Sequence, residues 1–567
     1  MSMTSTRPGE PALRTLGQFG GNALGRVLGL RPATTGYTVN RVEVPMRDGA
    51  RLVADHYAPT TSSPAGTVLV RGPYGRGFPF SLLFARLYAS RGYHVVMQSV
   101  RGTFGSTGQF EPMVHEAEDG ADTVAWLINQ PWFTGRFATL GPSYLGFTQW
   151  AILQNPPPQL AAAVITAGPH DFAASVWDTG SFAAGDFLGW SDMVAHQEDP
   201  VRLKSGLRQL RAPHRVARTV AEVPFGAAAR RMLGSGAPWF ESWVENTDPE
   251  LPFWERLRFG ASLDRVEVPV LLLGGWQDIF LRQTVRQYRH LRGRGVDVAM
   301  TIGPWTHTQL LTKGLSTGVR ESLDWLDTHL AGISTLRRPS RVRVCVTGQG
   351  WRNLPDWPPV TTQRALYLWP GRHLHDAPPD GAGLAPVTFR YDPANPTPTI
   401  GGALLAPVGG YRDDSRLARR DDVLTFDTAT LLDDLCVYGN PAIELQHSSD
   451  NPNVDVFVRV SEVDAKGRSR NVSDAYRRLG TPAELVRIEL DPVAHRFRAG
   501  SRIRVLITGS WSPRYAPNLG TDEPPLTARQ AKPATHAIAY GRSRLLLPVG
   551  PAELSANGGA DPGGHPG

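Results

Sequence analysis

Leu140-Gly141-Pro142-Ser143-Tyr144-Leu145-Gly146-Phe147 is the stretch from which the fold of this chain can be argued. A short apolar run from Phe137 precedes it, and a helical pattern from Phe147 to Leu153 follows. A serine at the tip of a strand–turn–helix unit is the layout of a nucleophile elbow, whose strained backbone exposes the hydroxyl above a sheet. The usual pattern is G-x-S-x-G, but here the second glycine stands one residue late. The motif alone therefore leaves a buried structural serine as an equal alternative.

Strand and helix patterns alternate on both sides of this elbow. Two short strands, Val42–Pro45 and Leu52–Tyr57, are joined by Asp48-Gly49 and predict an opening β-hairpin. Further apolar runs that predict strands lie at Thr67–Val70, Tyr93–Gln98, Ala161–Ala167, Val268–Leu273 and Val296–Ile302, separated by helical patterns at Phe80–Ser90, Ala117–Gln130, Arg282–Arg292 and Glu321–Leu330. This alternation is typical of an α/β domain with a mainly parallel sheet.

Two regions depart from the alternation. Residues 171–263 lack strand patterns, contain helical segments such as Val201–Leu210 and Ala227–Leu233, and are rich in tryptophan. From Arg341 onward, short alternating strands beginning with Val342–Val346 predict an all-β domain, a sandwich or a jelly roll. We predict a flexible tail (1–36), with a weakly amphipathic surface helix as the alternative for this segment. After it we predict an α/β core in two parts (37–170 and 264–336), a helical cap insertion (171–263), a β domain (337–553) and a disordered tail (554–567).

Polar residues follow three of the predicted core strands. Ser143 follows the strand that begins at Phe137, Asp278 follows Val268–Leu273, and His307 follows Val296–Ile302. In parallel sheets the reactive groups gather at the carboxyl ends of strands, and Ser…Asp…His is the chain order of the α/β-hydrolase triad. Histidine accepts the serine proton and the aspartate orients the imidazole, so this arrangement predicts a serine nucleophile. The alternative for Asp278 is a helix N-cap before Phe280.

Several short blocks also match a known family. They are Val44-Pro45-Met46-Arg47-Asp48-Gly49, Arg71-Gly72-Pro73-Tyr74, Arg101-Gly102-Thr103-Phe104-Gly105-Ser106-Thr107-Gly108, Gly141-x-Ser143-Tyr144-x-Gly146, Gly275-Trp276-x-Asp278 and Gly303-Pro304-Trp305-x-His307. Together they resemble the bacterial cocaine esterase-like (CocE/NonD) hydrolases of the X-Pro dipeptidyl-peptidase superfamily. The resemblance covers about residues 38 to 550 and includes the late glycine of the elbow. It implies an α/β-hydrolase core followed by a jelly roll.

The resemblance also implies roles for individual residues. Ser143 is expected to be the nucleophile, His307 the general base and Asp278 its partner. The oxyanion hole is expected to combine the backbone N–H of Tyr144 with the hydroxyl of Tyr74, because preorganised donors stabilise negative charge as it develops. The expected reaction needs no cofactor and no metal ion.

The substrate is expected to be a small ester or amide. Phe280 is expected to line the acyl pocket together with a tryptophan of the cap. Trp177 and Trp190 are equal candidates for that tryptophan. The alternatives are an X-Pro dipeptidyl-peptidase or an α-amino-acid ester hydrolase, which must hold an ammonium group with carboxylates. The apolar Ile279 and Phe280 occupy the positions after Asp278 where the latter enzymes carry acids.

Three acids of the cap, Asp186, Glu198 and Asp199, could replace those carboxylates, although a solvated helix face is the expected place for each. A further alternative, of another class, is a non-catalytic or carbohydrate-binding protein on the same scaffold. Loss of a triad residue or of Tyr74 would indicate a non-catalytic protein, whereas all four residues are present here. A carbohydrate-binding function of the β domain would be unaffected by Ser143→Ala.

Composition excludes other classes of function. The 567 residues carry a formal net charge of +7, but the arginines are scattered and only four lysines occur, which argues against nucleic-acid binding. No apolar run is long enough to cross a membrane, and residues 1–35 lack the apolar core of a secretory signal. With only two cysteines, Cys345 and Cys436, we expect a cytoplasmic protein with free thiols, and a single disulfide between them is the alternative. The oligomeric state is left open, a homodimer included.

Overall fold

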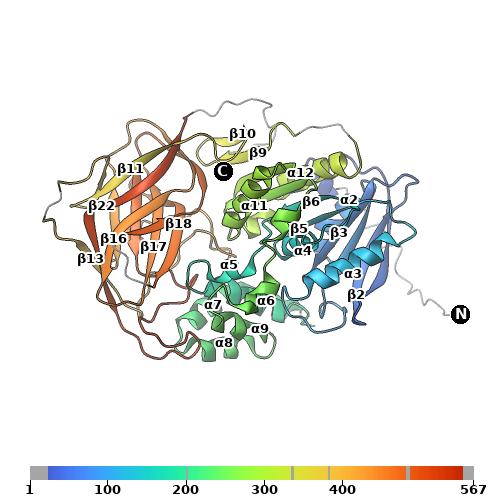
Figure 1. The fold of residues 1–567 in the computed structure, drawn as a ribbon, viewed down its shortest axis with the longest axis horizontal. Helices are drawn as coiled ribbons and strands as arrows, with labels where there is room; N and C mark the ends of the chain where they lie inside the picture. Colours follow the sequence, from blue (N-terminus) through green and yellow to red (C-terminus); the bar gives the residue numbers. More distant parts are fainter. Residues whose placement is uncertain (1–22, 200–201, 334–337, 381–382, 481–484, 553–567) are drawn as a thin grey trace.

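The computed structural model describes residues 23–199, 202–333, 338–380, 383–480 and 485–552. Figure 1 shows an α/β core beside a β domain, with the helices of the cap along one side of both. The architecture is that of an α/β-hydrolase core followed by an all-β domain, and it confirms the fold class predicted from the sequence.

The core is built on a ten-stranded sheet in the order β1-β2-β4-β3-β5-β6-β7-β8-β9-β10. Its strands are β1 (Tyr37–Pro45), β2 (Arg51–Pro59), β3 (Gly66–Gly72), β4 (Tyr93–Ser99), β5 (Phe137–Pro142), β6 (Leu160–Thr166), β7 (Val270–Gln277), β8 (Val298–Thr306), β9 (Val342–Val346) and β10 (Gly350–Leu354). The first two strands form the antiparallel hairpin, β2 pairs antiparallel with β4, and β3 to β8 run parallel to one another. Every residue of β3, β4, β5 and β7 is buried, which explains their continuous apolar character.

Helices cover this sheet and form the cap. In the core they are the π-helix η1 (Leu82–Arg86), α2 (Leu87–Ala89), α3 (Glu116–Ile128), α4 (Tyr144–Ile152), α11 (Leu281–Gly293), η3 (Thr308–Leu311) and α12 (Leu315–His329). In the cap they are α5 (Phe172–Trp177), α6 (Ala184–Ala195), α7 (Arg202–Ala221), α8 (Phe225–Leu233), α9 (Trp239–Glu245), η2 (Pro252–Leu257) and α10 (Ser262–Arg265). Helix α7 continues through Pro213 beyond its predicted end at Leu210, because Val216 and Val220 are buried against the cap.

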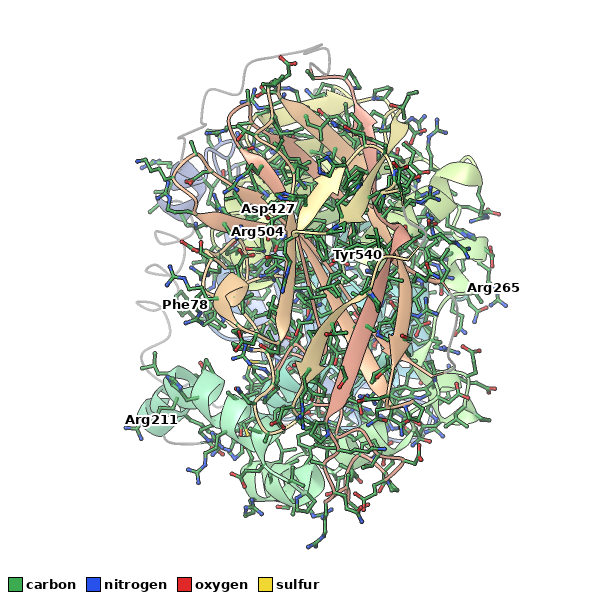
Figure 2. All side chains as sticks on the ribbon, turned by 90° about the vertical axis from the view of Figure 1, so that its left-hand side faces the viewer. Phe78, Arg211, Arg265, Asp427, Arg504 and Tyr540 are labelled. Carbon is green, nitrogen blue, oxygen red and sulfur yellow. The ribbon has the colours of Figure 1, made fainter. Side chains whose placement is uncertain are left out.

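The β domain holds twelve further strands in one hydrogen-bonded system. They are β11 (Thr362–Trp369), β12 (His373–His375), β13 (Val387–Tyr391), β14 (Val423–Asp427), β15 (Leu435–Gly439), β16 (Ala442–Ser449), β17 (Val454–Val463), β18 (Ser469–Leu479), β19 (Val486–Glu489), β20 (Val493–Phe497), β21 (Arg502–Thr508) and β22 (Ala534–Gly550), with the short helix η4 (Leu417–Arg419) between β13 and β14. Figure 2 faces this domain and shows Arg504 on β21 beside Asp427 on β14, which form a 2.7 Å ion pair. Arg211 of α7 projects from the cap in the same view.

Strand β9 corrects one sequence prediction. Val342–Val346 was expected in the β domain, but it pairs in parallel with β8 of the core sheet, where Val342 stands opposite Met300. Its side chains are alternately buried and half-buried. The alternation that suggested a sandwich strand therefore comes from a strand near the edge of the core sheet.

The predicted N-terminal tail is wrong for residues 23–36. Residues 23–27 are helical, and the side chains of Leu28 and Leu30 are buried in the main core cluster. Arg31 forms a 2.7 Å ion pair with Asp327 of α12. The apolar residues of this segment are separated by glycine and arginine. The sequence therefore contains no continuous apolar run from which their burial could have been predicted. Residues 1–22 and the predicted tail at 554–567 lie outside the described residues.

The two cysteines carry free thiols, Cys436 buried and Cys345 half-buried. Burial raises the pKa of both thiols, that of Cys345 to about 11, so neither is an activated nucleophile. In the part of the chain that the structure describes, we find no helix with the length and apolar character needed to cross a bilayer.

Candidate active site

Ser143 lies at a strained turn between β5 and α4. Its φ of 58° and ψ of −123° place it outside the regions that a non-glycine residue normally occupies. Such strain persists only where the surrounding structure holds it, and it is often found at functional sites. The serine caps α4 without a side-chain hydrogen bond to the helix, so its hydroxyl is not used for capping.

The late glycine of the elbow has a packing explanation. A Cβ on Gly146 would lie 2.5 Å from the Cα of Gly168, so the backbones of α4 and the segment after β6 meet at residue 146 rather than 145. The side chain of Leu145 packs against Gly72 and Gly141 instead. A Cβ on Gly72 would lie 2.3 Å from this side chain, and a Cβ on Gly141 would lie 2.4 Å from it. Glycines on β3 and β5 thus make room for the leucine that replaces the usual elbow glycine.

Asp278 and His307 form a close pair at the ends of neighbouring strands. Asp278 follows β7 and His307 follows β8, and Nδ1 of His307 lies 2.7 Å from Oδ2 of Asp278. Because a carboxylate accepts hydrogen bonds, this contact assigns the ring proton to Nδ1 and leaves Nε2 as the free base. The other oxygen, Oδ1, accepts the backbone N–H of Phe280 at 2.7 Å. Asp278 therefore accepts a hydrogen bond from the residue that precedes helix α11 and also orients the imidazole.

The strand order brings the three predicted triad residues to one edge of the sheet. Strands β5, β6, β7 and β8 are consecutive neighbours and run parallel, so their carboxyl ends lie together. Ser143 follows β5, Asp278 follows β7 and His307 follows β8. Asp278 is buried, while Ser143 and His307 are half-buried.

Tyr74 lies beyond the end of β3, next to the elbow. Its hydroxyl oxygen accepts the indole N–H of Trp190, on cap helix α6, at 3.0 Å. Burial raises the pKa of Tyr74, and hydrogen bonds with Trp190 and Ser143 act in the opposite direction. The phenol therefore stays protonated and adjoins Ser143, as a donor to an oxyanion must.

Tyr144 is held by a buried ion pair that the sequence analysis missed. Its hydroxyl donates to Oε1 of Glu116 at 2.8 Å and accepts the backbone N–H of Met113, also at 2.8 Å. Oε2 of Glu116 lies 3.1 Å from Nη2 of Arg71, and both side chains are almost fully buried. The signal in the sequence is Arg71, a charged residue directly after an apolar strand in the Arg71-Gly72-Pro73-Tyr74 block.

The block that begins at Arg101 braces the neighbouring loop. The guanidinium of Arg101 lies 2.6 Å from carboxylates of both Asp48 and Asp119. The backbone N–H of Phe104 donates to Oε1 of Glu198, from the segment after α6, at 2.9 Å. Glu198 is exposed, as expected, and ties the cap to this loop.

The residues proposed for the acyl pocket lie in different surroundings. Phe280 packs edge-on against the His307 ring, with centroids 5.3 Å apart. Trp190 contacts Tyr74 and stacks on Tyr144, with ring centroids 6.3 Å apart and planes 12° apart. Trp177 is buried in the cap and donates its indole N–H to the backbone oxygen of Trp243 at 2.8 Å. Its place in the pocket stays a prediction.

A cavity of about 690 Å³ opens between the cap, the β7–α11 segment and the β domain. Its walls include Asp278, Ile279 and Asp186. Asp186 was expected on a solvated helix face, but it is only 5% exposed. Its Oδ1 accepts the backbone N–H of Leu405 at 2.8 Å, and Arg514 lies 3.9 Å from its Oδ2. The N-terminal turn of α6 faces the β domain at this point, which explains the burial that sequence could not show. Asp199 is exposed, as expected.

Metal-ligating residues are not grouped near this edge. Across the described residues, no cluster of three or more His, Cys, Asp or Glu side chains is arranged to hold a metal ion.

Comparison with known families agrees with this geometry. The family model for X-Pro dipeptidyl-peptidase (S15 family) matches residues 48–309, and the model for the X-Pro dipeptidyl-peptidase C-terminal non-catalytic domain matches residues 335–545. The chain therefore carries an S15-type domain followed by the C-terminal non-catalytic domain of X-Pro dipeptidyl-peptidases. It is a hydrolase of the serine type.

Individual proteins also align along most of the chain. Cocaine esterase of Rhodococcus sp. is 29% identical over 542 residues, which span 85% of this chain and 92% of the esterase. The crystal structure of an aminopeptidase from a Thaumarchaeota archaeon matches with a TM-score of 0.77 at 24% identity, covering 90% of this chain and 96% of that one. An α-amino acid ester hydrolase matches with a TM-score of 0.76 at 23% identity, covering 96% and 100%. These two structures support the fold.

Proposed function

We propose that this serine hydrolase cleaves carboxylic esters through an acyl-enzyme on Ser143. The observation that carries the proposal is the 2.7 Å contact between His307 and Asp278, at the sheet edge where the strained Ser143 also lies. A strained serine alone could be structural. An imidazole held by a buried carboxylate at the same edge supplies the base that a serine hydroxyl needs.

In the acylation step, the Oγ of Ser143 attacks the carbonyl carbon and Nε2 of His307 takes the hydroxyl proton. The carbonyl oxygen becomes an oxyanion, which the Tyr144 N–H and the Tyr74 hydroxyl stabilise. The tetrahedral intermediate then breaks its bond to the alcohol oxygen, and His307 returns the proton to that oxygen as the alcohol leaves. Asp278 keeps the imidazole in the tautomer that both transfers require.

In the deacylation step, a water molecule takes the place of the alcohol. His307 removes one proton from this water as the oxygen attacks the acyl carbon. The bond to Ser143 breaks, and the proton passes from His307 to the serine oxygen. The products are the carboxylic acid and the enzyme in its starting state, so no cofactor enters the balance.

The surroundings of Asp278 favour a neutral acyl group. The next two residues, Ile279 and Phe280, are apolar, and the ring of Phe280 packs against His307. Asp186 is a buried acid on the cavity wall, but the N–H of Leu405 and the guanidinium of Arg514 share its charge. A carboxylate already engaged in this way is a poor partner for a substrate ammonium group.

The test is intact-mass labelling with an aryl fluorophosphonate on wild type and Ser143→Ala. We expect one added phosphonyl group on wild type and none on the variant. Hydrolysis of aryl esters and of Xaa-Pro anilides by wild type then identifies the substrate class, with ester cleavage expected to be the faster. Folded wild type that takes no label would contradict the proposal and favour a binding protein. Preference for Xaa-Pro anilides would identify a dipeptidyl-peptidase instead.

A further inference from the structure

Trp190 connects the cap to the predicted oxyanion hole. It lies on α6, about fifty residues beyond Ser143, and its indole N–H reaches the Tyr74 hydroxyl at 3.0 Å. The indole nitrogen is a donor only, so the direction of this hydrogen bond is fixed: Trp190 donates and the phenolic oxygen accepts.

This direction determines what Tyr74 can do. A phenol has one hydrogen to donate, and a donor such as Trp190 occupies a lone pair of the oxygen without using that hydrogen. The Tyr74 proton is then left for the other group that influences this hydroxyl, Ser143, or for an acyl oxygen beside it. Hydrogen bonds in series polarise one another, so a phenol that accepts from an indole is also a stronger donor.

Trp190 also stacks on Tyr144, whose backbone N–H is the second predicted donor of the oxyanion hole. The rings of Trp190 and Tyr144 are nearly parallel, and the rings of Tyr74 and Tyr144 meet edge-on with centroids 6.4 Å apart. Glu116 and Met113 fix the far end of the Tyr144 ring. Tyr144 is therefore held at its hydroxyl by the core and on its face by the cap.

We propose that Trp190 is the positioning residue of the oxyanion hole: its indole N–H fixes the Tyr74 hydroxyl in the orientation that donates to the acyl oxygen. This inference rests on the proposed function and assigns a catalytic consequence to the cap. It differs from a role in lining the acyl pocket, because it acts through Tyr74 and on the oxyanion, which is common to all esters. Truncation of the cap at α6 would then impair the chemical step and not only substrate selection.

The first test is a double-mutant cycle on ester hydrolysis with Trp190→Phe and Tyr74→Phe. Trp190→Phe keeps a ring against Tyr144 and removes the N–H. We expect it to lower kcat by about 10-fold with little change in KM, and Tyr74→Phe to lower kcat by about 100-fold or more. In the Tyr74→Phe background, Trp190→Phe should have no further effect. Equal losses in both backgrounds would overturn the proposal, since they would show that Trp190 acts without Tyr74.

Trp239→Phe is the matched control. Trp239 belongs to the same aromatic cluster, with its ring centroid 6.5 Å from that of Trp190, but its indole N–H donates to the Oγ of Ser191 at 3.2 Å. This variant should retain the wild-type kcat. A loss equal to that of Trp190→Phe would show that the cluster matters only as packing and would contradict the proposal.

The second test compares an ester with its thionoester, whose sulfur is a poor hydrogen-bond acceptor. The rate ratio between the two should be large in wild type and should fall in both Tyr74→Phe and Trp190→Phe. A pocket-lining role for Trp190 would leave the ratio unchanged. If Trp190→Phe does not fold, Trp190→Met fills the space without a donor and is subject to the same expectations.

Fluorophosphonate labelling separates failure of this inference from failure of the proposed function. If wild type takes the label and Trp190→Phe retains the wild-type kcat and rate ratio, Trp190 has no positioning role although Ser143 remains the nucleophile. If wild type takes no label, the proposed function itself fails and the inference falls with it.

Discussion

At the scale of single residues, Gly146 is where helix α4 meets the backbone of the segment after β6. We expect Gly146→Ala to lower the free energy of unfolding by about 2 kcal/mol or more, because the new methyl group would lie 2.5 Å from a Cα that cannot rotate away. It should also reduce fluorophosphonate labelling, since the turn carries Ser143. Urea unfolding and labelling rates measure both effects.

Gly293→Ala is the control for that substitution. Gly293 is the last residue of α11, and a Cβ there would have nothing within 4 Å. Alanine favours a helix over glycine by up to about 1 kcal/mol, so this variant should be equal to or slightly more stable than wild type. Equal losses in both glycine variants would contradict the account of the displaced elbow glycine.

The buried pair of Glu116 and Arg71 gives a second prediction at this scale. Glu116→Gln should cost about 3 to 5 kcal/mol of stability, because it leaves the Arg71 guanidinium buried without its counter-charge. Tyr144→Phe, which keeps the pair and removes one hydroxyl, should cost about 1 to 3 kcal/mol. Urea unfolding of the two variants checks the order. A Glu116→Gln variant more stable than Tyr144→Phe would show that the pair does not hold the elbow.

At the scale of elements, the segment before β1 behaves as part of the core. Leu28→Ala should lower the free energy of unfolding by about 2 kcal/mol or more, because the leucine side chain is buried against the main cluster. The neighbouring Val27 is 83% exposed, so Val27→Ala should leave stability unchanged. Thermal unfolding of the pair measures the difference. Equal behaviour of the two variants would mean that residues 23–36 contribute nothing to the core.

The elements also show what the sequence could and could not predict. Strands β3 to β8 were found because fully buried strands leave apolar runs, and Ser143, Asp278 and His307 were found because they follow such runs. Val342–Val346 was assigned to the wrong sheet, because alternation reports half-burial and not which sheet the strand joins. Glu116 was missed because its partners, Arg71 and Tyr144, are 45 and 28 residues away and meet it only in the fold.

At the scale of the whole molecule, the cap and the β domain complete the surroundings of a site whose proposed reactive groups all come from the core. The cap supplies Trp190 to the Tyr74 hydroxyl, and the β domain supplies Arg514 and Leu405 to Asp186 of the cap. These contacts connect the core, the cap and the β domain around one edge of the core sheet. A variant that loosens the packing between the domains should therefore reduce activity before it unfolds the core.

Buried and half-buried histidines in both domains should make the molecule sensitive to acid. Burial lowers the pKa of His56 and His447 to about 4 and that of His170 and His536 to about 3, against 6.5 in an unfolded chain. Between these values the unfolded state binds more protons than the folded state, so stability is lost as the pH falls below 6.5. At pH 5 each histidine should cost up to about 2 kcal/mol relative to pH 8.

Urea midpoints between pH 8 and pH 5 measure this dependence, and His170→Asn should flatten it. His375→Asn is the control, because His375 is exposed on β12 and its replacement should leave the slope unchanged. The fall should begin near pH 6.5, the pKa of histidine in the unfolded chain, and should therefore precede the loss of the carboxylate ion pairs, because carboxylates take up protons only at lower pH. A stability that stays level from pH 8 to pH 5 would mean that these histidines are hydrated in the folded protein.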